Sequence, residues 1–253
     1  MQVTLSMLLL VCPLCFLAGF VDSIAGGGGL ISLPAYYLAG LPPVLAAGTN
    51  KLSACLGTTA ATVRYFIGKK VVVRVALAAA LGALPGSWLG SSLLFLIPEN
   101  TIRIMMIVII PIVALVVLRK GNRLGGRCLV GKKAVLPVSL AIGLGVGFYD
   151  GLVGPGTGTF LILLFTGILG MEAVMASGTA KVVNLASNIA ALTNLFGTGN
   201  VLPALGLPAA CCSILGALLG SHLTIRKGTG LIRGILLAVL LLLLAKMVWD
   251  VVS

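Results

Sequence analysis

Long apolar runs constrain the fold of this chain more than any other feature. Val71–Ile97, Ile102–Leu118 and Leu231–Val248 approach or exceed the roughly 20 apolar residues that a membrane-spanning helix needs. Backbone polar groups cannot be left open to lipid, so a spanning segment must be a helix or part of a closed barrel. Barrel strands alternate apolar and polar residues, whereas these runs are continuous. The sequence therefore predicts an all-α polytopic membrane protein.

Composition and charge agree with a protein of the cell (inner) membrane. The chain is 59% hydrophobic and 9% charged, with a mean hydropathy of +1.21, whereas soluble domains carry roughly 25% charged residues. The formal net charge is +12. Basic residues of membrane proteins gather in cytoplasmic loops beside lipid headgroups, so the bilayer and not nucleic acid is the expected partner. Met1–Ala18 lacks the basic start of a cleavable signal peptide.

The six cysteines predict neither a disulfide framework nor a metal site. Cys12 and Cys15 have the spacing of a redox or metal motif, but they lie in an apolar segment and no second ligand pair accompanies them. Small apolar packing residues are the favoured interpretation. No metal and no cofactor is expected.

An internal repeat divides the chain into two halves. "GFVDSIAGGGG" from Gly19 is echoed by "GFYDGLVGPGTG" from Gly147, and "AAGTNKL" from Ala46 is echoed by "MASGTAKV" from Met175. The second echo places Lys51 and Lys181 at equivalent positions, 130 residues apart. Apolar segments often resemble one another by chance, but offsets of 128 residues at the aspartates and 130 residues at the lysines are too similar to arise that way. The sequence predicts a first transmembrane repeat over 1–118, a basic linker over 119–133 and a second repeat over 134–253.

Each half is expected to contain about five hydrophobic segments, or about 8–10 in all. A long helix leads to a glycine break, a short or re-entrant helix follows, then a helix with the Gly-Thr-x-Lys motif, and two more apolar helices close the half. The linker and the turn at Lys69–Lys70 are basic, which places both in the cytoplasm. In the second half the basic residues come one helix later, at Arg226–Lys227. Equivalent helices would then run in opposite directions, which predicts inverted-topology repeats with both termini outside.

The glycine breaks are the predicted binding site. Interrupted helices at matching positions of two inverted repeats mark the substrate site of many transporters. The free N–H groups and the positive dipole end of each short helix would favour an anion. Close helix packing is the alternative, and it is the favoured interpretation for the isolated Gly82, Gly86 and Gly90. The break residues expected to bind substrate are Gly26, Gly27, Gly28, Gly29, Gly156, Thr157 and Gly158.

Two lysines in apolar segments are the expected source of positive charge. A lysine inside the bilayer is expensive and indicates function by default. Alternatively, each lysine neutralises the aspartate of its own repeat and only holds helices together. The aspartates are expected to hold the lysines when no substrate is bound and to take up a proton when an anion arrives. The substrate-binding candidates on these helices are Asn50, Lys51, Thr179, Lys181 and Asn184, with Asp22 and Asp150 for charge pairing or coupling; Ser53, Thr58 and Asn188 could line the same cavity.

These motifs give the chain a resemblance to a known family. With "GFVDSIAGGGGLISLP", "GTNKL" and their echoes, the sequence resembles the sulfite exporter TauE/SafE family of membrane permeases over nearly its whole length. The second half departs from the glycine-rich pattern, with "GPGTG" in place of a run of glycines. The resemblance implies secondary transport, mostly export, of sulfur-bearing anions such as sulfite or organosulfonates.

Two rival functions remain open. A passive anion channel could use the same breaks and lysines. An intramembrane serine protease would use the "ASG" at Ala176–Gly178 with His222 as base. However, Ser177 aligns with Ala47 in a motif whose other members repeat, which favours a structural role and a protein that is not an enzyme. Proton coupling and a homodimer are further expectations.

Overall fold

The computed structural model describes residues 3–98, 101, 128–228, 230 and 234–235, and these residues form a helical protein. The predicted all-helical class is confirmed, and the described part of the chain contains no strand. The predicted segment at Ile102–Leu118, nearly all of Leu231–Val248 and most of the linker lie outside the described residues. The helices are α1 Leu5–Ala25, α2 Gly29–Leu38, α3 Pro43–Ile67, α4 Val73–Leu93, a 3-10 turn at Lys132–Ala134, α6 Val135–Leu152, α7 Thr157–Gly167, α8 Ala173–Gly197 and α9 Pro203–Lys227.

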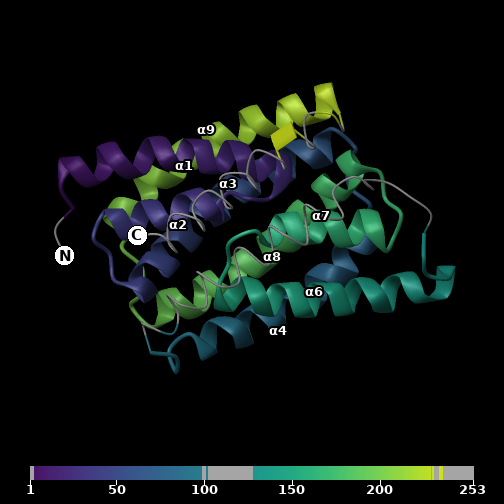
Figure 1. Cartoon of the computed structure of the whole chain (residues 1–253), viewed down its shortest axis with the longest axis horizontal. Helices are drawn as coiled ribbons and strands as arrows, with labels where there is room; N and C mark the ends of the chain where they lie inside the picture. Colours follow the sequence, from purple (N-terminus) through teal and green to yellow (C-terminus); the bar gives the residue numbers. More distant parts are fainter. Residues whose placement is uncertain (1–2, 99–100, 102–127, 229, 231–233, 236–253) are drawn as a thin grey trace, which may run out of the picture.

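Long apolar helices lie on the two outer sides of the described protein. Four helical segments are long and apolar enough to cross a membrane, namely Leu5–Ala25, Val73–Leu93, Lys132–Leu152 and Pro203–Lys227. Figure 1 shows α1 with α9 along one side and α4 with α6 along the other, with α2, α3, α7 and α8 between them. The short helices α2 and α7 have 10 and 11 residues. At about 1.5 Å per residue neither reaches the roughly 30 Å of a bilayer core.

The helix boundaries of the two halves follow the sequence repeat. Helices α3 and α8 are both 25 residues long and begin at equivalent positions, Pro43 and Ala173. Helices α4 and α9 also begin at equivalent positions, and α2 and α7 each begin immediately after a break. Packing follows the same rule, because α1 packs along α9 as α6 packs along α4, and α3 contacts α9 as α8 contacts α4. The two halves are therefore interlocked, each placing its first helix against the other half's last described helix.

Small residues allow the outer pairs of helices to pack closely. A Cβ atom at Gly82, Gly86 or Gly90 of α4 would lie within 3 Å of the backbone of α6, at Leu144 or one turn further along. Real Cβ atoms do not approach backbone that closely, so these glycines are needed for packing. This is the role that the sequence predicted for them.

Apart from Asp22, Lys51, Asp150 and Lys181, the charged side chains of the described residues gather at one end of the molecule. The turn before α4 meets α8 there, since the Val72 N–H donates to the Thr179 hydroxyl, and Gly68 lies beside Ile225 of α9. We call this the basic end, and its charged residues are Arg64, Lys69, Lys70, Arg74, Lys132, Lys133, Glu172, Arg226 and Lys227. The other end, where Leu41, Leu94, Leu195 and Leu202 pack, has no charged side chain among its described residues. We call it the uncharged end.

Candidate functional site

The two glycine breaks lie against each other. A Cβ atom at Gly158 would be 2.5 Å from the Cα of Gly26, so the two backbones are in contact. Gly26 has φ +80°, a left-handed conformation that ends α1 and that glycine adopts without strain. The Thr159 hydroxyl donates to the Ala25 carbonyl at 2.8 Å and joins the breaks further. The structure thus brings together the two motifs that the sequence singled out, with Gly26 and Gly158 as the contacting pair.

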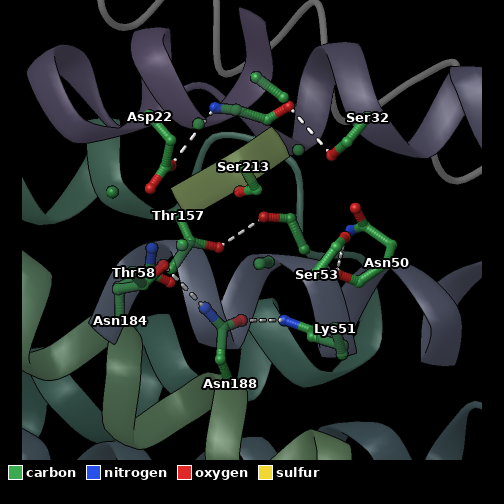
Figure 2. A pocket seen from close by; sticks show the side chains of 18 of the residues that line it. Asp22, Ser32, Asn50, Lys51, Ser53, Thr58, Thr157, Asn184, Asn188 and Ser213 are labelled. Carbon is green, nitrogen blue, oxygen red and sulfur yellow. Dashed lines mark hydrogen bonds between the residues drawn. The ribbon is translucent and has the colours of Figure 1, made fainter. Parts of the chain in front are cut away.

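A cavity lies beside this junction and takes residues from both halves (Figure 2). We call it the central cavity. Its walls come from α1, α2, α3, α6, α8 and α9 and from both breaks. The predicted site residues that line it are Asp22, Gly26, Gly28, Gly29, Asn50, Lys51, Asp150, Thr157, Gly158 and Asn184. Gly27, Gly156, Thr179 and Lys181 are not among the lining residues.

A second cavity leads from this site toward the uncharged end. It shares Asn50, Lys51, Asp150 and Gly154 with the central cavity. Its other walls are mostly apolar and include Leu94, which packs with Leu195 and Val44 at the uncharged end. Asn50, Lys51 and Asp150 therefore border both cavities.

Lys51 is held in a buried polar network. Its Nζ donates to the Asp150 Oδ2 at 2.7 Å and to the Asn188 Oδ1 at 3.0 Å. Asp150 also accepts hydrogen bonds from the hydroxyls of Thr157, at 2.7 Å, and Ser187. The lysine and aspartate side chains are 7% and 3% exposed. A buried ion pair needs such additional hydrogen bonds to offset its loss of hydration.

The second ion pair has a different environment. Lys181 Nζ donates to the Asp22 Oδ2 at 2.7 Å, and Lys181 is completely buried whereas Asp22 is 19% exposed. The Asp22 Oδ1 also accepts from the Gly28 N–H at 3.3 Å. Asp22 therefore lines the central cavity and Lys181 lies behind it.

Both ion pairs cross between the halves. The alternative that each lysine neutralises the aspartate of its own repeat is wrong, because Lys51 pairs with Asp150 and Lys181 with Asp22. The physical reason is the interlocked packing, in which α3 and α8 meet at the centre and each lysine helix faces the other half's break. The ion pairs consequently connect the halves.

The starts of the short helices are already engaged by protein groups. At α2 the Gly28 N–H binds the Asp22 carboxylate, and at α7 the Thr157 hydroxyl binds the Asp150 carboxylate. The sequence predicted a bound anion at the starts of these helices, and in the structure each start contacts an aspartate carboxylate. The absence of a side chain at Gly28 is explained by its packing against α1. A Cβ there would lie 2.5 Å from the Asp22 Cβ and 2.6 Å from the Ala18 carbonyl oxygen, so Gly28 is required by α1.

Thr179 and its equivalent Thr49 join the halves. The Thr179 hydroxyl accepts from the Val72 N–H at 3.0 Å and donates to the Met175 carbonyl at 2.7 Å. Thr49 makes the equivalent bonds with the Leu202 N–H at 3.0 Å and the Leu45 carbonyl at 2.7 Å. Each threonine thus satisfies the N–H just before a helix of the other half, which would otherwise be orphaned. The threonine of the Gly-Thr-x-Lys motif has a structural role that sequence reasoning missed, although its repetition in both halves was the signal.

Ser177 and His222, the two residues of the protease hypothesis, contact different partners. The Ser177 hydroxyl donates to the Ile24 carbonyl at 3.0 Å and lies 3.1 Å from the Tyr65 hydroxyl. His222 Nδ1 contacts the Arg64 guanidinium at 2.5 Å. Ser187, which binds Asp150, was not predicted because its repeat equivalent is Gly57 and the pattern carries no signal there.

Comparisons with known proteins identify a family of membrane proteins. The sequence model of the family described as "Sulfite exporter TauE/SafE" matches residues 11–247. "Probable membrane transporter protein YfcA" of Escherichia coli K12 is 37% identical over 240 residues, covering 92% of this chain and 87% of that protein. A "Probable membrane transporter protein" of Haemophilus influenzae is 35% identical over 251 residues, covering 99% and 98%. "Probable membrane transporter protein ORF9" of Sinorhizobium is 34% identical over 235 residues, covering 93% and 90%. No solved structure matches the chain.

Proposed function

The chain belongs to the sulfite exporter TauE/SafE family, and on this premise we propose that it is a secondary transporter that exports small sulfur-bearing anions such as sulfite or organosulfonates. It is a membrane transporter by family and by its relatives. The residues proposed to bind substrate are those of the central cavity, with Lys51 as the cation.

The observation that carries the proposal is the pairing of Lys51 with Asp150 at the cavity wall. Lys51 is buried and donates at 2.7 Å to a carboxylate contributed by the other half. An arriving oxyanion offers the same kind of acceptor as the carboxylate, so it competes for the ammonium. Substrate binding would therefore loosen a contact between the halves, which is the coupling that a transporter needs.

Inverted repeats would supply the moving parts. The helix bounds and the packing of the halves correspond element by element. Between the central cavity and the basic end, Tyr65 donates to the Ser23 carbonyl at 2.8 Å and Ser177 to the Ile24 carbonyl at 3.0 Å. The second cavity leads from Lys51 toward the uncharged end. We propose that this arrangement is closed at the basic end, and that rocking of the halves exchanges the open and closed ends.

Orientation follows from the basic end. Its eight described Lys and Arg residues and single Glu contrast with an opposite end that has no charged side chain among its described residues. By the positive-inside rule the basic end would face the cytoplasm of a multi-pass inner-membrane protein. The described start of α1 lies near the uncharged end, so the N-terminus would be outside (Figure 1).

Charge balance favours the coupling of anion binding to proton uptake. Two lysines and two aspartates neutralise one another in the described core, and a bound anion would add an unbalanced charge to a low-dielectric site. Uptake of a proton by the aspartate released from Lys51 would restore neutrality. We therefore propose Asp150 and Asp22 as the coupling groups, with anion and proton carried in a linked cycle.

Flux measurements in proteoliposomes test the function. Purified protein should transport a sulfur anion with saturation, should show counterflow, and should respond to an imposed pH gradient. Competition by sulfite, sulfate, thiosulfate, taurine and sulfoacetate would rank the substrates. Flux that rises linearly with concentration and ignores the pH gradient would favour the passive channel, and absence of sulfur-anion flux would end the proposal.

A further inference from the structure

Asn50 carries a buried amide that lacks a partner. Its side chain is 9% exposed, and its Oδ1 has no hydrogen-bond partner among the described residues. Its neighbours on α3 are engaged, since Thr49 bonds to Leu45 and Leu202, and Lys51 bonds to Asp150 and Asn188. Buried polar atoms are nearly always partnered, so an orphan beside a cavity indicates a missing ligand or water.

The position of Asn50 suits a ligand contact. It borders both the central cavity and the second cavity, next to Lys51 (Figure 2). The sequence repeat does not explain why an asparagine occupies this position. Thr49 and Lys51 recur as Thr179 and Lys181, whereas the equivalent of Asn50 is Ala180. Helix packing common to the two halves therefore does not require an amide at this position.

The chemistry of the amide indicates what would satisfy it. An asparagine side chain has one acceptor oxygen and one donor NH2 group. A fully deprotonated oxyanion presents acceptors alone, so it can bind Lys51 and the NH2 group but leaves the amide oxygen unpaired. A ligand with a hydroxyl group as well as an anionic oxygen satisfies both ends of the amide.

From this we propose that Asn50 determines specificity, and that its amide selects small sulfur oxyanions that carry a hydroxyl group over those that lack one. The inference rests on the proposed function and names the ligand feature that the site reads. Hydrogensulfite carries such a hydroxyl on sulfur, and a hydroxyalkyl sulfonate carries it on the tail. A site that hydrogen-bonds a ligand hydroxyl rejects the analogue without it, because its buried polar group is then left unpaired.

Matched ligand pairs test the inference by equilibrium binding to purified wild-type protein. Isethionate and ethanesulfonate have the same charge and differ by a hydroxyl on the tail; hydrogensulfite and methanesulfonate, compared at pH 6, differ at the sulfur itself. We expect the hydroxyl-bearing member of at least one pair to bind about tenfold more tightly. The pair that shows the preference identifies where the hydroxyl lies.

Asn50→Leu keeps the approximate size of the side chain and removes both hydrogen-bonding groups, and Asn50→Ala is the second variant. Each should bring the affinity ratio of the preferred pair close to one. Asn50→Leu should fold at least as stably as wild type, since it removes an orphaned polar atom. Thr62→Val is the matched control, because Thr62 Oγ1 is also buried without a partner but Thr62 does not line either cavity; its ratio should match wild type.

Three outcomes are informative. The role of Asn50 is overturned if wild-type protein binds both members of each pair equally, or if Asn50→Leu keeps the wild-type affinity ratio. Either result leaves the proposed transport function standing. Wild type that binds none of the four sulfur anions contradicts the proposed substrate class itself. A ratio lost equally in Asn50→Leu and Thr62→Val would assign the effect to the stability of α3 and would also overturn the inference.

Discussion

Lys51 and Asp150 lie 2.7 Å apart, although 99 residues separate them in sequence and they belong to different halves of the protein. Lys181 and Asp22 form the reciprocal pair. Lys51 borders both cavities, whereas Lys181 is enclosed. The two pairs are thus equivalent by repeat but unequal in their access to ligand.

Removing the charge of Lys51 should weaken anion binding by at least about tenfold, because the ammonium faces the cavity. Lys51→Met keeps the stem of the side chain and leaves Asp150 without its counter-ion, which destabilises a buried pair by about 3–5 kcal/mol. Lys51→Met/Asp150→Asn should recover much of that stability without recovering binding. Calorimetry with sulfite and thermal unfolding of the same samples separate the two effects. Unchanged affinity in both variants would show that Lys51 is structural.

Lys181→Met should affect stability more than ligand affinity, since the residue is fully buried and reaches the cavity through Asp22 alone among its described contacts. We expect a lower melting temperature, and an affinity changed less than in Lys51→Met. The measurement is the same pair of assays, run side by side. Equal loss of affinity in the two lysine variants would mean that both cations contact substrate, as the sequence alone predicted.

Gly26→Ala should prevent correct folding. The new Cβ would overlap the backbone at Gly158 and Thr159, and φ +80° strains any residue with a side chain. Gly145→Ala is the control, because a Cβ at Gly145 meets no heavy atom within 4 Å. We expect the first variant to be lost from the monodisperse peak in size-exclusion chromatography and the second to elute as wild type does. A well-folded Gly26→Ala protein would contradict the close contact of the breaks.

Thr179→Val should lower stability by about 1–2 kcal/mol, because the part-buried Val72 N–H at the start of α4 loses its hydrogen-bond partner. Thr49→Val should act similarly through the Leu202 N–H. Ligand affinity should stay close to wild type, since neither hydroxyl faces the central cavity. Thermal unfolding and binding assays on both variants check this, and a selective loss of affinity would return Thr179 to the substrate site.

Membrane orientation can be measured by cysteine accessibility in a background without the native cysteines. Asn200→Cys, at the uncharged end, should react with an impermeant reagent added to intact cells. Lys132→Cys, at the basic end, should react after permeabilisation alone. The reverse pattern would contradict the proposed orientation.

The sequence by itself determined the helical membrane class, the repeat and the positions of the breaks. These properties are local: a run of apolar residues specifies a helix in lipid, and glycines at Gly26 and Gly154 allow the positive φ angles that interrupt it. The helix predicted to carry the Gly-Thr-x-Lys motif is α3, from Pro43 to Ile67. The motifs also identified Lys51, Asn50, Asp22 and Asp150 as candidates before their surroundings were known.

The tertiary structure decided which charge meets which and which residues reach the cavity. The sequence presents Lys51 and Lys181 as equals, and the halves had to be packed together before one lined a cavity and the other lay behind Asp22. It also left Thr179 as a ligand candidate, whereas the fold uses its hydroxyl to satisfy the Val72 N–H. Such roles depend on contacts between helices more than 90 residues apart. Periodicity within one helix shows where its apolar side chains lie, but it carries no information about which partner another helix will bring to it.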